Sequence, residues 1–255
     1  MKYFIRNAAL GAAFTMFGLT AVSAAVSSQN LDQMVQFNLA KINVDTVNGS
    51  VIDTLAQKGT FPAAKNEPGM IGMYYGTYAG AKATDATHDY YFFELYQNAK
   101  AYDAHKAGQA FKDYIAGTQG MINSKSIDFA NPALVKVRMD QPGKVMDLSI
   151  IMAPDSDHLQ AVLDYQIVQA KKTYGNHPDD VVGTIVAVDK TKPVVYVWTV
   201  YRDQVSYGNA IADRHLTDVD MDPKAVPSKI NTIPMLVSGD SIVFTHDFEN
   251  RYRGQ

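Results

Sequence analysis

Apolar and polar positions along the chain form blocks that predict strands and helices in a regular order. A strand pattern from about Met34 to Val44 precedes apolar residues at helical spacing from Val47 to about Lys58. Two segments rich in β-branched and aromatic residues then predict a hairpin, GMIGMYYGTYAG and HDYYFFELYQ. A helix from about Ala99 to Ala116 and a strand around Ala133 to Arg138 complete a β-α-β-β-α-β order, which is typical of a ferredoxin-like unit.

The same order is repeated in the second half of the chain. We expect a strand from about Val145 to Ala153, a helix from Asp157 to Thr173, and a hairpin from DVVGTIVAVDK and KPVVYVWTVYR. Matching residues support the repeat, since Val51–Gly72 resembles Val162–Gly183, and SKSIDFANPALVKV resembles SKINTIPMLVSGD. Because the offset between matched residues drifts slowly and in order, we infer one duplicated unit.

A single ferredoxin-like unit has helices on one face of its sheet and leaves the other face bare. Two units in one chain can cover each other's bare faces. We therefore expect an α+β fold in which two tandem units, 31–140 and 144–250, form an intrachain dimeric α+β barrel. The expected linker, RMDQPGKV, contains Pro142 and Gly143 and is short. A monomer and a homo-oligomer formed through the outer edges both stay open.

The N-terminal segment, residues 1–25, has the pattern of a secretory signal peptide. Lys2 and Arg6 precede an apolar run from Ala8 to about Val22, and small residues follow at VSAA. We expect cleavage near this site and a periplasmic or secreted protein, with an uncleaved membrane anchor as the alternative. No later apolar run approaches membrane-spanning length, so we expect no membrane span after cleavage.

Composition excludes several classes of chemistry. The chain has no cysteine, which excludes disulfides, thiol nucleophiles, iron–sulfur clusters and cysteine-bound zinc. A net charge of −3 with interspersed signs gives no basic stripe, so we expect no nucleic-acid partner. The histidines show no close metal-binding spacing, and no metal site is predicted.

Four segments of the first unit carry a family resemblance: FNLAKINV, EPGMIGMYYGTYAG, YYFFELYQNAKAYDAHKAGQAFKDY and SIDFANP. Together they resemble the antibiotic biosynthesis monooxygenase (ABM) family of dimeric α+β barrels, which includes candidate quinol monooxygenases. The resemblance covers about Gln33 to Pro132, with Glu67-Pro68-Gly69, Glu94 and the AYDAH helix in the family's order and spacing. The second unit resembles the family only faintly.

The resemblance implies an apolar cavity between sheet and helices, in which enzymes of the family oxidise phenolic or quinol-like aromatics with dioxygen, often without a cofactor. Other members degrade haem or isomerise small molecules. We therefore expect an exported ABM-like monooxygenase that oxidises a small aromatic molecule or quinol and requires no cofactor. The alternatives are a non-catalytic binding or scaffold protein with the same barrel, and a haem-binding protein that uses His105.

Glu94 and His105 are the candidate catalytic residues. Alternation along the strand puts Tyr90, Phe92, Glu94 and Tyr96 on one face, so Glu94 lies in an aromatic row where burial raises the pKa of a carboxyl group. Such a group can act as a general base. The alternative is a structural carboxylate bonded to a backbone amide, a tyrosine or Lys41. His105 could transfer a proton, stabilise an oxyanion or bind iron, or it could be a packed, half-buried histidine.

Substrate contacts are expected from six further residues. Asn38 could hold an oxygen atom of a ligand, although it could equally be an edge or solvent-facing residue. The others would line an aromatic pocket, although tyrosines on strands more often serve ordinary packing; they are Tyr74, Tyr75, Tyr96, Tyr102 and Phe111. The family often has a histidine directly before the residue matching Phe111, whereas this chain has Ala110. This departure weakens any mechanism that needs two imidazoles.

The second unit lacks both candidate catalytic groups. Thr199 and Ala210 occupy the positions aligned with Glu94 and His105. We therefore expect only the first unit to be active and the second to complete the barrel, with Trp198 and Tyr196 in its core.

Overall fold

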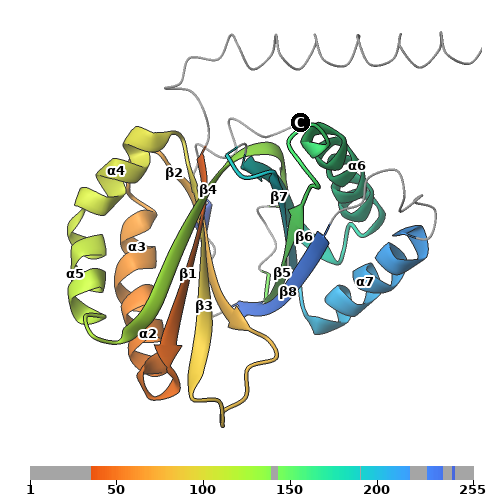
Figure 1. The fold of residues 1–255 in the computed structure, drawn as a ribbon. Helices are drawn as coiled ribbons and strands as arrows, with labels where there is room; N and C mark the ends of the chain where they lie inside the picture. Colours follow the sequence, from red (N-terminus) through yellow and green to blue (C-terminus); the bar gives the residue numbers. More distant parts are fainter. Residues whose placement is uncertain (1–35, 139–142, 190, 219–228, 238–242, 245–255) are drawn as a thin grey trace, which may run out of the picture. The chain divides into compact units, whose positions relative to one another are not determined.

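Antiparallel strands close into a barrel in the computed structural model, which describes residues 36–138, 143–189, 191–218, 229–237 and 243–244 (Figure 1). Eight strands of this described part follow one another in the order β3-β1-β4-β6-β7-β5-β8-β2, and β2 pairs with β3 to close the ring. The expected signal segment and half of the expected linker, residues 139–142, lie outside the described residues. None of the helices within the described ranges is both long and apolar enough to cross a membrane.

The first half has the expected order of elements, with a longer first helical segment and a longer last strand, and the helix predicted from about Ala99 to Ala116 is broken at Gly108. A 3-10 turn, Thr46–Asn48, and a π turn, Ala56–Thr60, flank α2 and lead into α3. The main elements are β1 (Gln36–Asp45), α2 (Gly49–Leu55), α3 (Phe61–Ala64), β2 (Met70–Tyr78), β3 (Thr87–Tyr96), α4 (Ala99–Ala107), α5 (Gln109–Gly117) and β4 (Ile122–Val137).

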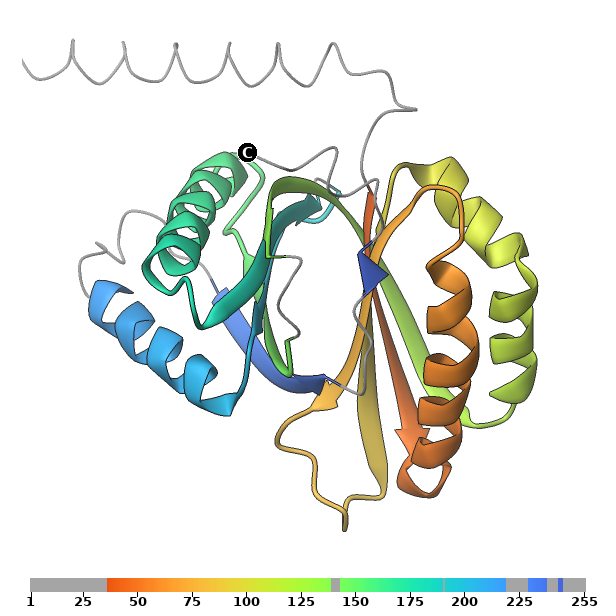
Figure 2. The same cartoon turned by 180° about the vertical axis from the view of Figure 1, so that it is seen from behind.

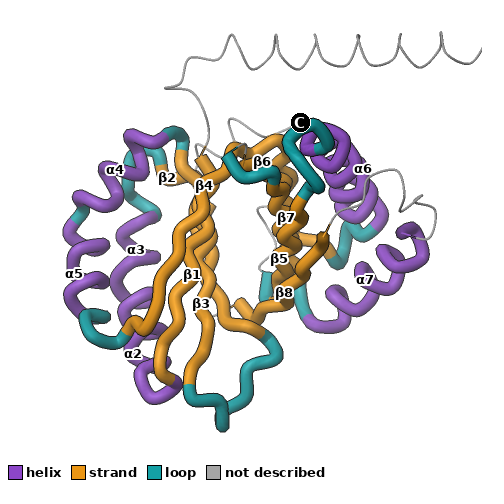
Figure 3. The backbone as a smooth tube through the Cα atoms, viewed as in Figure 1, coloured by secondary structure: helices purple, strands orange, loops and turns teal. Residues whose placement is uncertain are grey.

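The second half repeats this order with single, uninterrupted helices. Its elements are β5 (Val145–Met152), α6 (Leu159–Asn176), β6 (Val181–Asp189), β7 (Val194–Tyr201), α7 (Gln204–Asp218) and β8 (Lys229–Val237). A short strand, β9 (Val243–Phe244), adds to β2. Figure 3 shows strands at the centre and helices outside them.

Two equivalent strand pairings join the two halves of the chain. The last strand of the first half, β4, pairs with β6, and the last strand of the second half, β8, pairs with β2. Both contacts are antiparallel. β4 is long because its N-terminal part pairs with β1 and its C-terminal part pairs with β6. The strand predicted from Ala133 therefore begins eleven residues earlier, at Ile122.

Buried side chains pack on both faces of the barrel sheet, inside the barrel and beneath the helices. The barrel interior is filled from both halves, with Phe93 stacked on Trp198 at a ring separation of 5.1 Å. As expected, Trp198 and Tyr196 lie in this core. Helices α2 to α5 cover the outer face of the first half and α6 and α7 that of the second, as Figure 2 shows from behind. The alternation predicted for β3 is confirmed, because Tyr91 faces the barrel and Phe92 faces the helices.

Candidate active site

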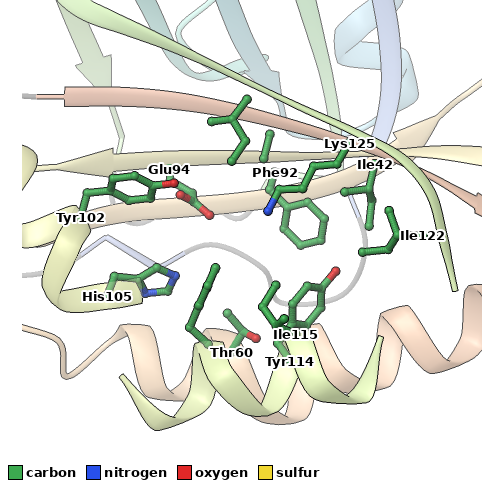
Figure 4. Close-up of a pocket in the computed structure, with 13 residues that line it drawn as sticks. Ile42, Thr60, Phe92, Glu94, Tyr102, His105, Tyr114, Ile115, Ile122 and Lys125 are labelled. Carbon is green, nitrogen blue, oxygen red and sulfur yellow. The ribbon is translucent and has the colours of Figure 1, made fainter. Parts of the chain in front are cut away.

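A cavity lies between the sheet and the helices of the first half (Figure 4). The centres of water molecules can occupy about 50 Å³ of this cavity, so it has room for a few waters. Its walls are mainly aliphatic and aromatic, with a small polar set. The lining residues are Ala40, Ile42, Thr60, Phe92, Glu94, Tyr102, His105, Phe111, Tyr114, Ile115, Ile122, Lys125 and Ile127.

Glu94 enters the cavity from β3 and is held by two neighbours. The Tyr96 hydroxyl donates to Glu94 Oε2 at 3.0 Å, and Asn38 Nδ2 donates to the same oxygen at 3.5 Å. Burial raises the pKa of Glu94 above its usual value, and the charges and donors around it only partly oppose this effect. Lys41 is not a partner, because it forms an ion pair with Asp89. The carboxyl is therefore suited to hold a proton nearer to neutral pH.

His105 enters the cavity from α4 and is 2% exposed. Its Nδ1 lies 2.6 Å from Glu67 Oε2. Because an ionised carboxylate can only accept a hydrogen bond, this contact places the proton of a neutral imidazole on Nδ1. Nε2 is buried and has no hydrogen-bond partner among the described residues. The lone pair of Nε2 is then available to accept a proton from a ligand.

A tight turn after α3 places Glu67 against α4. The amide of Met70 donates to the carbonyl of Glu67 at 3.2 Å, and the amide of Gln97 donates to the carbonyl of Gly69 at 2.8 Å. Gly69 has φ +82°, a conformation that favours glycine, and a Cβ at this position would lie 2.6 Å from the Cβ of Ala101. The Glu-Pro-Gly sequence therefore fixes the backbone that carries the carboxylate.

Two hydroxyl groups also face the cavity without a partner among the described residues. They are Thr60 Oγ1, on a residue 6% exposed, and Tyr114 Oη, on a residue 9% exposed. Thr60 ends the π turn, an irregularity that is frequent at functional sites. Burial raises the pKa of Tyr114 well above its usual value, so this phenol stays protonated and can donate.

The cavity approaches the surface beside α5. Phe111, Ile115 and Ile122 line both the cavity and a neighbouring surface groove with about 520 Å³ open to water centres. Ile115 is 40% exposed, and Lys125 is also exposed. A benzene ring occupies a cavity of about 150 Å³. An aromatic ligand therefore requires Phe111 or Ile115 to move outward.

The structure brings together four of the residues expected in the site. Glu94, His105, Tyr102 and Phe111 line the cavity. Asn38 and Tyr96 do not line it but bond to Glu94. Asn38 is fully buried, so the solvent-facing alternative for it is wrong.

The remaining two candidates do not line the cavity. Tyr75 lies on the helix side of β2, and its hydroxyl bonds to Asp53. Tyr74 points the opposite way, into the barrel, where its ring meets Trp198 edge-on at 4.5 Å. Adjacent residues of one strand face opposite sides of a sheet, so Tyr74 and Tyr75 cannot share one pocket.

The sequence reasoning missed Glu67, Thr60, Tyr114 and Lys125. Glu67 belongs to the Glu-Pro-Gly segment of the family resemblance, but no sequence pattern connects it with His105, which follows 38 residues later. Thr60 lies just beyond the end of the first predicted helix and Tyr114 lies within the second, and only the packing of the helical segments shows which hydroxyls face inward.

The second half keeps a buried acid near the corresponding point but takes it from another strand. Asn38 lies opposite Glu94 in the β1–β3 pairing, and Asp147 lies opposite Thr199 in the β5–β7 pairing. Tyr201 donates to Asp147 at 3.0 Å, as Tyr96 does to Glu94. No imidazole joins it from the aligned helix position, which is Ala210.

Comparison with known proteins relates the chain to oxygenases by fold. A candidate monooxygenase from Fusobacterium nucleatum matches with a TM-score of 0.69 at 14% identity, over 83% of this chain and 94% of the other. One from Lactobacillus acidophilus matches with a TM-score of 0.67 at 16% identity, over 83% and 96%. An anthrone oxidase-like protein matches with a TM-score of 0.50 at 11% identity, over 83% and 94%. No protein-family profile and no curated protein sequence matches the chain.

These structures define the class of fold. The chain has an α+β fold with an eight-stranded antiparallel barrel, which it shares with candidate monooxygenases. Structures of candidate antibiotic biosynthesis monooxygenases also match, over less than half of this chain. The resemblance seen in the sequence implied a barrel of α+β type, and the structure has such a barrel.

Proposed function

We propose that this protein is an exported monooxygenase that oxidises a small aromatic or quinol-type substrate with dioxygen and requires no cofactor. The observation that carries the proposal is the pairing of two groups in one apolar cavity. One is a carboxyl group whose pKa is raised by burial, Glu94, and the other is an imidazole with a free Nε2, His105. Groups of this kind take protons from weakly acidic hydroxyls.

The proposed reaction begins with removal of a proton from the bound hydroxyl by His105 Nε2 or Glu94. The resulting anion is electron-rich and passes one electron to dioxygen, which gives a substrate radical and superoxide. Their recombination forms a carbon–oxygen bond. Cleavage of the O–O bond then leaves one oxygen atom on the substrate, and the other departs as water with the two hydrogens that the substrate has lost. The apolar walls keep bulk water away from these intermediates.

Neighbouring residues have supporting roles in this scheme. Glu67 holds His105 in the tautomer that leaves Nε2 unprotonated. Tyr96 and Asn38 orient the Glu94 carboxyl. Lys125 brings a positive charge toward the carboxyl, as Figure 4 shows, and a charge there also favours a substrate anion.

Two further features belong to the same proposal. The β4–β6 and β8–β2 pairings connect equivalent strands of the two halves. This equivalence supports a tandem pair of ferredoxin-like units arranged as a dimer within one chain. The N-terminal sequence supports export after cleavage of residues 1–25. Mass spectrometry of the mature protein from the native cell tests the cleavage.

Oxygen uptake by the purified protein tests the enzymatic function. Reduced quinones and phenols of increasing size are added, and oxygen consumption is followed with product analysis. We expect turnover by wild type and a loss of about 10²-fold or more in a Glu94→Gln, His105→Ala double variant. Equal rates in the two proteins would rule out these roles.

Ala110, at a position where the family often has a histidine, favours a second candidate, a binding or scaffold protein without turnover. This alternative predicts that a ligand copurifies and is released unchanged on denaturation. Haem binding through His105 Nε2 predicts a Soret band on titration. Sites for drug-sized ligands have volumes of about 300 Å³ or more, so haem requires a much larger opening than an aromatic ring.

A further inference from the structure

Two polar atoms of the cavity have no part in the proposed proton transfer. They are Thr60 Oγ1 and Tyr114 Oη, which are buried and have no partner among the described residues. Burial of a hydroxyl without a partner is unfavourable, because the group loses its hydrogen bonds to water. Both side chains line the cavity, so a ligand or water inside it can supply the missing bond.

The local backbone leaves the Thr60 hydroxyl without a bond to its own helix. Thr60 ends a π turn, and Phe61 then begins α3. A threonine inside a regular helix commonly bonds to a carbonyl of the preceding turn, as Thr118 does with Tyr114 O at 2.8 Å. Thr60 makes no such bond. The irregular turn therefore leaves its hydroxyl available to the cavity.

The two hydroxyls lie apart from the group that would be deprotonated. In Figure 4, His105 lies below Glu94 and Tyr102 at one end of the cavity, and Tyr114 lies toward Ile122 at the other. Thr60 lies on the helix side between them. Aliphatic side chains such as Ile42 and Ile115 form much of the rest of the wall. The Tyr114 hydroxyl thus lies toward the end of the cavity away from His105, and the Thr60 hydroxyl lies between the two.

We propose that Thr60 and Tyr114 bind a second oxygen atom of the substrate, on the Tyr114 side of the cavity and away from the hydroxyl that faces Glu94 and His105. The matching ligand is a small ring with oxygen functions on opposite sides. The inference rests on the proposed function in one respect, namely that the cavity receives a small oxygenated ring. It adds that these two hydroxyls select rings with the distal oxygen over rings without it.

Binding of hydroquinone and phenol, measured by calorimetry without oxygen, tests the inference. The two test ligands differ only in the distal hydroxyl, and binding is measured whether or not turnover occurs. Two hydrogen bonds of ordinary strength correspond to a preference of about tenfold or more for hydroquinone. In a Thr60→Val, Tyr114→Phe double variant, we expect this preference to fall to about twofold or less, with phenol affinity unchanged.

A matched control removes a phenol hydroxyl outside the cavity. Tyr90→Phe changes a buried tyrosine of the same sheet face that does not line the cavity, and it should keep the wild-type preference. The single variants Thr60→Val and Tyr114→Phe should each lose part of the preference, which covers the case of a double variant that does not fold. An unchanged preference in folded variants overturns the inference. It is also overturned if wild type binds both ligands equally, or neither, even where oxygen uptake with another substrate supports the proposed function.

Discussion

His105 and Glu67 meet through a contact of 2.6 Å between Nδ1 and Oε2, although 38 residues separate them. The histidine is almost fully buried, and the glutamate side chain is 21% exposed. The carboxylate therefore lies at the outer side of the imidazole and Nε2 at the cavity side. This contact fixes the orientation of the imidazole, because Nδ1 is bonded to Glu67 while Nε2 has no hydrogen-bond partner among the described residues.

Glu67→Gln tests this orientation. The amide of glutamine can donate to Nδ1, which would move the imidazole proton to Nε2 and remove the proton acceptor from the cavity. We expect kcat for oxygen uptake to fall by about 10²-fold with little change in KM. Glu67→Asp, which keeps the carboxylate on a shorter side chain, should retain more activity. A rise in KM at unchanged kcat would show that Glu67 serves binding instead.

Replacing His105 with alanine opens a space that a small base can refill. We expect activity in His105→Ala to fall by about 10²- to 10⁴-fold, and added imidazole to restore part of it in a concentration-dependent way. Imidazole should not restore Glu94→Gln, which is the matched control. A folded His105→Ala protein that keeps wild-type activity would contradict a catalytic role for this residue.

The burial of the Glu94 carboxyl group is expected to lower the stability of the protein at pH values where this group is ionised in the unfolded chain. Because burial raises its pKa, the folded protein retains this proton at pH values where the unfolded chain has lost it. Stability therefore falls as pH rises from the ordinary value of 4.5 through the raised native pKa. Glu94→Gln removes this dependence, and its glutamine oxygen can still accept from Tyr96 and Asn38.

Urea unfolding of both proteins at about pH 4 and about pH 8 measures the difference. We expect the free energy of unfolding of Glu94→Gln, relative to wild type, to be higher at the upper pH than at the lower. Its oxygen-uptake activity should be lost at both. A variant that is relatively less stable at the upper pH would show that the carboxylate stabilises the fold.

The second half offers a test of whether one site or two is active. Asp147 is fully buried and accepts from Tyr201, but the helix position aligned with His105 is Ala210. We expect Asp147→Asn to leave oxygen uptake within about twofold of wild type, because the alanine at the position aligned with His105 supplies no imidazole for the matching proton transfer. A loss comparable to that of Glu94→Gln would reveal a second functional site.

Local periodicity predicted the parts of the site that depend on one strand. Alternation placed Glu94 and Phe92 on the same face of β3, and both line the cavity. Contacts between distant segments could not be read in this way, since the approach of Glu67 to His105 depends on a turn and on helix packing together. Similarly, the strand predicted around Ala133 to Arg138 begins earlier, at Ile122, because β4 continues through Pro132 at a register shift, where a missing amide is tolerated.

Gly69 and Gly120 form a matched pair for testing how the Glu-Pro-Gly turn supports the site. Both have positive φ, 82° and 78°, so alanine at either position strains the backbone by about 1–3 kcal/mol. Only at Gly69 does the added Cβ meet another atom, the Cβ of Ala101 at 2.6 Å, whereas nothing lies within 4 Å at Gly120. Gly69→Ala should therefore destabilise the protein more than Gly120→Ala does.

The activities of the two glycine variants should diverge as well. Relief of the clash at Gly69 requires the turn and α4 to separate, and these segments carry Glu67 and His105. We expect Gly69→Ala to lower kcat under conditions where both variants are fully folded, while Gly120→Ala keeps wild-type kcat. Urea unfolding and oxygen uptake on the same samples separate the two effects. Equal stability losses, or equal activities, would mean that close packing of the turn on α4 does not set the Glu67–His105 geometry.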